Sequence, residues 1–291
     1  MKTPLPVLAL LFNALIWGLA WWPFRQMLDA GLHPLWATAL MYAAIVAVLT
    51  LARPGIWAQA RAVPALLLLA FSSGLNNVAF NWAISIGDVV RVILLFYLMP
   101  AWAVLLAWRI LGERPTPAAL GRLALAFAGV LLVLWPQGAG ASARLSATLG
   151  LADGLALLGG FMFALTNVLL RRMQAVPSQA RMLAMFVGCC AMALLAALGG
   201  QALALVPAFP AFDARWALAA AGLAVLLMVG NWALQYGAAR LAAGTTAVVM
   251  LSEVVFASGS SMLAGSAQPT AQTLLGGALV VGAALLAALR R

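Results

Sequence analysis

The sequence predicts an all-α membrane protein with ten transmembrane helices arranged as two inverted five-helix repeats. Hydrophobic residues make up 66% of the chain and charged residues only 8%, with a mean hydropathy of +1.08. A soluble domain carries about 25% charged residues. The apolar residues form long runs without the polar alternation of a transmembrane β-barrel. Similar positions also recur in the same order in the two halves of the chain.

Ten apolar runs, each of roughly 17 to 25 residues, are long enough to cross a bilayer as helices. They cover residues 5–27, 34–52, 63–85, 89–110, 118–136, 149–171, 179–200, 215–237, 243–264 and 270–289. The connections are short, so no soluble domain is expected. The first run is longer than a signal-peptide core and has no small-residue cleavage site after it, which indicates a retained helix.

The basic residues predict the orientation, because cytoplasmic loops carry an excess of Lys and Arg. With a cytoplasmic N-terminus, that side holds Lys2, Arg53, Arg61, Arg109, Arg114, Arg122, Arg171, Arg172, Arg181, Arg240, Arg290 and Arg291. The other side keeps Arg25, Arg91, Arg144 and Arg215. Both termini are therefore expected to be cytoplasmic. The formal charge of +10 does not indicate nucleic-acid binding, since these residues form no basic stripe.

The two halves of the chain can be aligned with each other. Residues 80–83 (FNWA) correspond to residues 230–233 (GNWA), residues 11–27 align with 157–173 without a gap, and Pro100 falls opposite Glu253. The shared order predicts a first repeat at 1–144 and a second at 145–291, together forming one transmembrane domain. Because five is odd, the second repeat enters from the opposite face, an arrangement by which many secondary transporters alternate access around a midplane site.

Glu253 lies in the middle of the ninth run, between Ser252 and Val254. An acidic residue at that depth costs about 3 kcal/mol on insertion scales, so it is a functional-site hypothesis by default. Three roles are open: pairing with a cationic group of a solute, carrying a coupled proton, or holding a helix break by hydrogen bonding. The second role follows because burial favours the neutral carboxyl. The structural alternative is a protonated or helix-capping carboxyl.

Side-chain amides form a second set of candidates for substrate binding. Asn77 and Asn81 share one helix face in the third run, as do Asn231 and Gln235 in the eighth. Amides donate and accept hydrogen bonds, which suits a zwitterion or polar metabolite. The alternative is bonding between helices, worth about 0.6 kcal/mol on average.

Aromatic residues complete the candidate site, because a π-rich cavity favours aromatic or cationic ligands. The candidates are Trp17, Trp21, Trp82, Tyr97 and Phe163. Other tryptophans lie near run ends, where such residues are usually interfacial anchors. This second group is Trp22, Trp36, Trp57, Trp135 and Trp216.

The remaining polar residues are weaker candidates. Arg91 is expected to pair with Asp88 at the outer mouth rather than face the cavity, and Asp153 and Asn167 lie in the sixth run. A membrane-embedded enzyme would need a catalytic constellation, and one histidine with six carboxylates shows none. No metal, cofactor or nucleotide-binding loop is indicated. A structural membrane protein, which transports nothing, would need neither a repeated midplane break nor a buried carboxylate.

Three stretches resemble the EamA-like, ten-helix branch of the drug/metabolite transporter superfamily. They are residues 14–18 (ALIWG), residues 94–100 (LLFYLMP) leading to 111–114 (LGER), and residues 251–255 (LSEVV). Val254 stands where the family pattern has proline, and the second Leu-Gly-Glu has become Ala264-Gly265-Ser266. The resemblance covers essentially the whole chain and defines the substrate poorly.

The resemblance implies a multi-pass protein of a bacterial inner (plasma) membrane, with a central cavity between two five-helix halves. It implies secondary transport of small organic metabolites, such as amino acids or related aromatic and cationic solutes, often as an exporter. The expected mechanism is alternating access, with a small-molecule substrate and the lipid bilayer as partners. Proton coupling and facilitated diffusion both remain open, and the sequence does not give an oligomeric state.

Overall fold

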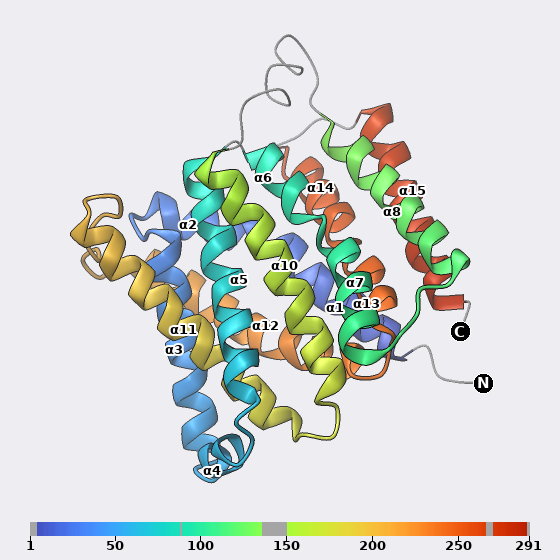
Figure 1. Cartoon of the computed structure of the whole chain (residues 1–291). Coiled ribbons are helices and arrows are strands. Elements are labelled where there is room, and N and C mark those ends of the chain that lie inside the picture. The colour runs from blue at the N-terminus through green and yellow to red at the C-terminus, as the bar shows by residue number, and fades with distance from the viewer. Residues whose placement is uncertain (1–4, 88, 136–149, 266–269, 290–291) are drawn as a thin grey trace.

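The computed structural model describes residues 5–87, 89–135, 150–265 and 270–289. In these residues every regular element is a helix and there is no strand (Figure 1). The helices are α1 (Leu5–Leu19), α2 (Trp21–Asp29), α3 (Pro34–Ala52), α4 (Ile56–Arg61), α5 (Leu66–Ile86), α6 (Val89–Phe96), α7 (Met99–Leu111), α8 (Pro117–Leu134), α10 (Leu151–Arg172), α11 (Ser178–Ala202), α12 (Ala214–Ala238), α13 (Ala243–Met250), α14 (Glu253–Leu263) and α15 (Ala271–Leu289).

Seven helical segments of the described residues are long and apolar enough to cross a membrane. They are Leu5–Asp29, Pro34–Ala52, Arg91–Leu111, Leu151–Arg172, Ser178–Ala202, Ala214–Ala238 and Ala243–Leu263. Two shorter apolar helices, Pro117–Val133 and Ala271–Ala287, run beside them. The predicted class of an all-helical, multi-pass membrane protein is confirmed.

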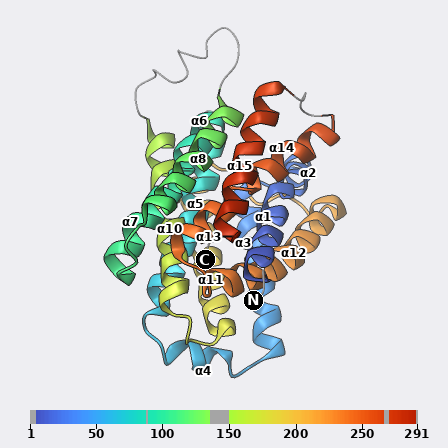
Figure 2. The same ribbon diagram turned by 90° about the vertical axis from the view of Figure 1, so that its right-hand side faces the viewer.

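The helices form one bundle in which elements far apart in sequence are neighbours. α5 packs against α10 and α11, α3 packs against α11, and α1 packs against α12 and α14. α8 and α15 pair with each other along one flank, in green and red in Figures 1 and 2. Most buried side chains fall into two large clusters, one around α1, α10 and α13 and one around α3, α11 and α12.

Glycines allow the closest of these helix contacts. A Cβ on Gly188 of α11 would collide with the Ala70 carbonyl of α5, and one on Gly74 would collide with the Gly188 carbonyl. In the flanking pair, a Cβ on Gly129 would lie 2.7 Å from the Gly276 carbonyl oxygen. Small residues are enriched at membrane helix interfaces because they let two backbones approach closely.

One end of the bundle gathers arginines, and we call it the basic end. There Arg53 donates to the Gln179 side chain at 3.1 Å, and Arg171 donates to the Ala239 carbonyl at 2.7 Å. These contacts bring together α4, the α10–α11 connection and the α12–α13 connection, which lie at the bottom of Figure 1. Arg61, Arg172, Arg181 and Arg240 lie in or beside the same elements.

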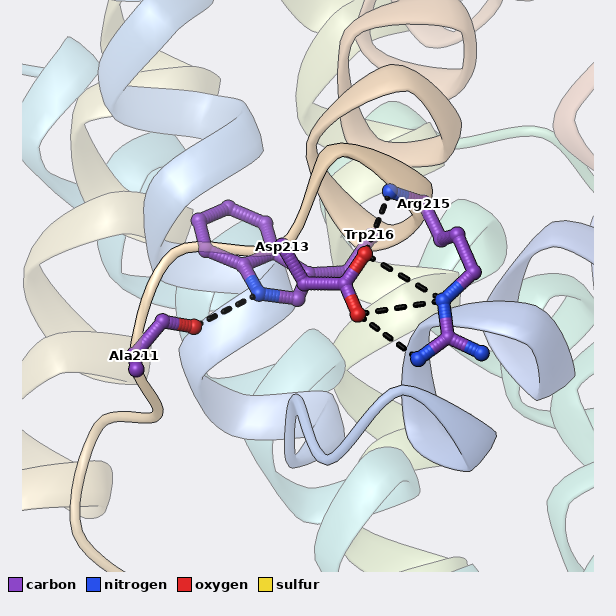
Figure 3. Close-up of polar contacts among 4 residues, drawn as sticks. All are labelled: Ala211, Asp213, Arg215 and Trp216. Carbon is purple, nitrogen blue, oxygen red and sulfur yellow. Dashed lines mark hydrogen bonds and ion pairs between the residues drawn. The ribbon is translucent and has the colours of Figure 1, made fainter.

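At the opposite end, Asp213 begins α12 (Figure 3). Its carboxylate accepts from the Arg215 backbone N–H at 2.7 Å and from the Arg215 guanidinium at 2.7 Å. Trp216 follows and donates its indole N–H to the Ala211 carbonyl at 3.2 Å. A side-chain oxygen at this position satisfies backbone N–H groups that the first helical turn leaves unpaired.

Two tryptophans interpreted as interfacial anchors are buried instead. Trp216 is 5% exposed and Trp36 is 7% exposed. Trp36 donates to the Pro207 carbonyl at 2.9 Å, and both indoles pack edge-on against Phe209. The interpretation was wrong for these two because the 203–213 connection folds over them. Trp22 and Trp135 are about half exposed, at 55% and 52%.

Candidate functional site

Two of the described spans are interrupted in their middles, each by two residues, while the span Leu5–Asp29 has a one-residue break at Ala20, between α1 and α2. α6 ends at Phe96 and α7 begins at Met99, while α13 ends at Met250 and α14 begins at Glu253. Pro100 is the second residue of α7, so it corresponds to Val254, the second residue of α14. The sequence match places Pro100 opposite Glu253, one residue before Val254.

The second break forms without a proline. The Ser252 hydroxyl donates to the Val249 carbonyl at 2.7 Å, and the Val254 N–H donates to the Leu251 carbonyl at 3.1 Å. A serine hydroxyl that bonds a carbonyl one turn back competes with the helical pattern. The missing proline therefore does not abolish the break, because local hydrogen bonds tighten the turn.

Glu253 is the first residue of α14 and is partly accessible. Within the described part of the chain, no hydrogen bond or ion pair reaches its carboxylate. Tyr97, from the break in the other span, lies within electrostatic range of it. The carboxylate of one break and the phenol of the other therefore lie in the same part of the bundle interior.

Aromatic rings surround the break at Tyr97. Phe96 lies 4.4 Å from Phe80 of α5, 5.9 Å from Phe163 of α10 and 6.0 Å from Tyr97, between ring centroids. A Cβ on Gly160 would lie 2.5 Å from the Phe96 carbonyl oxygen, so α10 approaches the break directly. Tyr97 and Phe163 are therefore brought together, as part of one aromatic cluster.

α1 supplies the wall beside Glu253. A Cβ on Gly18 would lie 2.9 Å from the Glu253 carbonyl oxygen, so the backbone of α1 approaches the start of α14 at the residue after Trp17. Trp21 donates its indole N–H to the Ser260 hydroxyl at 2.9 Å. Trp17, Trp21 and Glu253 are thus contributed by three helices, α1, α2 and α14.

The amides of α5 bond to neighbouring helices. Asn77 donates to the Cys189 sulfur at 3.4 Å and accepts from the Tyr42 hydroxyl at 3.4 Å, while Asn81 donates to the Thr38 hydroxyl at 3.0 Å. Trp82 packs between α3 and α11, against a cluster containing Ala39. In this conformation these residues connect α5 to α3 and α11.

The amides of α12 also face another helix. The side-chain amide of Gln235 lies 2.7 Å from the Asn231 Oδ1 atom. Asn231 also donates to the Met185 sulfur of α11 at 3.7 Å. With its amide oriented to satisfy both polar atoms, Gln235 donates to the Ser178 carbonyl at 3.0 Å. This pair ties α12 to the first turns of α11.

Several buried polar atoms make no hydrogen bond, although buried polar groups are almost always paired. They are Asn13 Oδ1, Asn76 Oδ1, Trp102 Nε1, Asn167 Oδ1 and Thr246 Oγ1. Asn13, Trp102 and Thr246 were not predicted as site residues. Asn13 had a usable signal, since it is an amide in the middle of the first apolar run and lies four residues before Trp17.

Both ends of α10 are held by ion pairs to the first interrupted span. Asp153 accepts from Arg91 of α6 at 2.7 Å. At the other end, the Arg171 Nε lies 3.4 Å from the carboxylate of Glu113, a residue just beyond the end of α7. Glu113 also accepts from the Ala243 N–H at 3.1 Å, which caps α13. The expected partner of Arg91, Asp88, lies outside the described residues.

The described residues contain no assembled site for metal binding or for thiol chemistry. No group of three or more His, Cys, Asp or Glu side chains comes together in them. Cys189 and Cys190 are free thiols. Cys189 is buried, and its sulfur lies 3.3 Å from the Ser73 hydroxyl oxygen. They are packing residues of the α5–α11 contact.

The fold and these interior contacts define a polytopic helical membrane protein with two interrupted spans. The model of the EamA-like transporter family matches residues 4–135. This match confirms the resemblance to EamA-like transporters of the drug/metabolite transporter superfamily that was found in the sequence. The family consists of membrane transporters of small solutes, and the chain is assigned to that class.

Two other comparisons bear on the assignment to this family. A protein of known crystal structure, 21% identical to this chain, aligns with a TM-score of 0.77 over 98% of this chain and 99% of its own. At that identity the likeness shows a shared fold over the full length. No curated protein matches the chain.

Proposed function

We propose that the protein is a secondary transporter that exports small organic solutes by alternating access. The observation that carries the proposal is that Tyr97 and Glu253 each lie at a helix break, in two spans that pack against each other. Interrupted helices near the midplane are typical of substrate sites in secondary transporters. An enzyme role has no support from a catalytic constellation in the described residues, and a structural role leaves the accessible Glu253 unexplained.

The proposed architecture is ten transmembrane helices in two inverted repeats, at 1–144 and 145–291. The helix neighbours support it. Exchanging the two repeats converts the α5–α10 contact into the α12–α1 contact, and the α7–α10 contact into the α14–α1 contact, and all four occur. The multi-pass protein would lie in a bacterial inner membrane with its basic end and both termini cytoplasmic, following the excess of basic residues on that side.

The proposed solute site lies between α1, the breaks of both interrupted spans, and α10. Trp17, Trp21, Tyr97 and Phe163 would hold a flat or cationic solute, and Glu253 would pair with its cationic group or bind a coupled proton. Unpaired buried atoms such as Asn13 Oδ1 and Trp102 Nε1 supply polar contacts for a solute. Asn77, Asn81, Trp82, Asn231 and Gln235 would contribute only after α5 or α12 moves, because their present partners are protein groups.

The proposal is tested by solute-induced stabilisation of the purified protein, using a panel of amino acids, aromatic amines and organic cations at two pH values. A ligand that binds the folded state raises its stability by RT ln(1 + [L]/Kd). We expect one solute class to stabilise the wild type and Glu253→Gln to lose at least tenfold in affinity for it. Asp213→Asn, which removes a carboxylate at the end of the bundle, should keep full affinity.

Transport is then measured with the same solutes in proteoliposomes. Saturable, solute-specific flux that Glu253→Gln abolishes would support the carrier, and a pH-dependent flux would favour proton coupling. Unsaturable ion flux would contradict the carrier in favour of a channel. Equal affinity of Glu253→Gln and wild type would remove Glu253 from the site.

A further inference from the structure

A groove opens on the outside of the bundle at its basic end. It has a volume of about 940 Å³ and lies between α1, the C-terminal half of α12, the α10–α11 connection and the first turn of α11. The groove is separate from the proposed solute site, since neither Tyr97 nor Glu253 lines it. It is therefore a second candidate site, and its chemistry is set by two arginines.

The first arginine, Arg181, is only 4% exposed and lines the groove. Its guanidinium donates to the Leu170 carbonyl at 3.1 Å, which fixes the side chain against the last turns of α10. Within the described residues it forms no ion pair. A guanidinium has five N–H donors, so one carbonyl leaves most of its capacity unused.

The second arginine, Arg240, is exposed at the end of α12. Its guanidinium lies 3.8 Å from the centre of the Tyr236 ring and donates to the Tyr236 carbonyl at 3.0 Å. Arg181 and Arg240 are close enough for their positive charges to repel each other. No Asp or Glu is among the residues that line the groove. Two restrained, unneutralised guanidiniums favour an anion, and a phosphate matches the planar fork of each.

The N-terminus of α11 reinforces this preference. α11 is 25 residues long, begins after Pro177, and has no side-chain hydrogen bond that caps its first turn. Ser178, its first residue, lines the groove beside the arginines. The free N–H groups of a helix N-terminus carry a positive partial charge that stabilises anions.

The walls of the groove are apolar, so they favour a ligand with an apolar part. Leu5 and Phe12 are seven residues apart on α1, hence on one helix face, and they are 52% and 43% exposed. Val229 and Trp232 of α12 are 38% and 47% exposed. Seven helical residues rise about 10 Å, so this apolar lane is long enough for much of an acyl chain. A phosphate at one end and hydrocarbon along the walls describe a phospholipid.

We propose that this groove binds an anionic phospholipid from the leaflet at the basic end of the bundle. The phosphate would lie between Arg181 and Arg240, and one acyl chain would follow Phe12, Val229 and Trp232. Basic pockets between membrane helices bind anionic head groups by the same chemistry. Because the groove reaches α1, α11 and α12 together, a bound lipid would stabilise their present arrangement.

The test is lipid binding by the full-length protein in mixed micelles, followed by native mass spectrometry and by melting temperature. The probes are phosphatidylglycerol and phosphatidylcholine with the same acyl chains, together with soluble glycerol phosphate and inorganic phosphate. We expect phosphatidylglycerol to bind more tightly than phosphatidylcholine and to raise the melting temperature. The two soluble anions should do neither at equal concentration.

The variants are Arg240→Gln, Arg240→Lys and, as a matched control, Arg172→Gln. Arg172 is an exposed arginine at the same end that does not line the groove. Arg240→Gln should weaken phosphatidylglycerol binding about fivefold, the equivalent of about 1 kcal/mol per basic residue near an anionic surface. Arg240→Lys should keep part of the preference, and Arg172→Gln should keep all of it. Melting temperatures without lipid show whether each variant is folded.

Three outcomes would overturn the proposal. Equal binding of the two lipids would remove the charge selectivity. Equal loss in Arg240→Gln and Arg172→Gln would mean a diffuse surface effect. Stabilisation by inorganic phosphate alone would make the groove a site for a soluble anion. Each outcome is independent of solute transport, so failure here leaves the proposed function to its own test.

Discussion

Arg91 and Asp153 form a largely buried ion pair, 2.7 Å between nitrogen and oxygen, with side chains 15% and 8% exposed. It joins the start of the first interrupted span to the start of α10, and Asp153 also accepts from the Gly150 N–H at 2.8 Å. The pair therefore fixes one end of the α6–α10 contact. Glu113 and Arg171 connect the other ends of the same two spans, with a longer and more exposed pair.

Arg91→Met should destabilise the protein by about 3 kcal/mol, because it leaves the buried Asp153 carboxylate without this partner. The melting temperature in detergent measures the loss. Arg215→Met is the control, since its ion pair with Asp213 lies at the exposed end of α12, where such pairs contribute little. A melting temperature equally unaffected by both changes would show that the Arg91–Asp153 pair does not hold α6 to α10.

Gly188→Ala should disrupt the α5–α11 contact, because the added methyl group would collide with the Ala70 carbonyl. Small-to-large changes in a packed interface cost about 1–3 kcal/mol. Gly199→Ala is the matched control on the same helix, where a Cβ would meet nothing within 4 Å. The control should be neutral or gain about 0.5–1 kcal/mol from the higher helix propensity of alanine. Thermal unfolding of both variants measures the difference, and equal melting temperatures would argue against the close approach.

Val254→Pro should be tolerated, because Pro100 occupies the corresponding second position of α7. The change removes one short hydrogen bond, from the Val254 N–H to Leu251. Proline is accepted in the first turn of a helix. Ala257→Pro, in the interior of α14, should instead cost about 3 kcal/mol. Equal losses of folded protein in detergent for the two variants would mean that the span is continuous at residues 251–252.

Stability should fall as the pH drops through the histidine range, because His33 caps α3. Its Nδ1 accepts from the Leu35 N–H at 3.3 Å, which requires the unprotonated nitrogen. Partial burial lowers the pKa of His33 below its ordinary value of 6.5. The unfolded chain therefore binds the proton more readily, so this contribution is present above pH 6.5 and is lost below it.

His33→Asn tests this cap, since asparagine caps helices well and does not titrate in this range. The melting temperature of the wild type should decline more steeply than that of His33→Asn between pH 7.5 and pH 5. The difference is bounded by the value of one cap, about 1 kcal/mol. Parallel pH profiles would assign the decline to other groups.

Glu113→Ala should destabilise the basic end more than Glu113→Gln. Glutamine keeps an oxygen for the Ala243 N–H and loses only the charge that faces Arg171. Alanine loses both contacts, and the cap alone is worth about 1 kcal/mol. Melting temperatures should therefore rank wild type, glutamine and alanine in that order. If glutamine and alanine are equally destabilised, the charge rather than the cap holds α13.

The sequence determined the membrane class, the family resemblance and nearly every span boundary. The predicted spans 34–52 and 243–264, for example, correspond to α3 and to α13 with α14. These features follow from local physics, because a bilayer requires a long apolar run with internally satisfied backbone groups. The position of Glu253 in the middle of an apolar run could be recognised from the sequence for the same reason. Its alignment with Pro100 could be recognised as well.

Only the tertiary structure decided which residues meet. It gave Asn77, Asn81, Asn231 and Gln235 partners on neighbouring helices. It paired Arg91 with Asp153, 62 residues away. It also covered Trp36 and Trp216 with the 203–213 connection, which the composition predicts only as a loop. Helix rotation and neighbour choice depend on glycine contacts and side-chain packing between distant segments. In a chain whose helices are apolar on most faces, the hydrophobic pattern of one helix does not specify them.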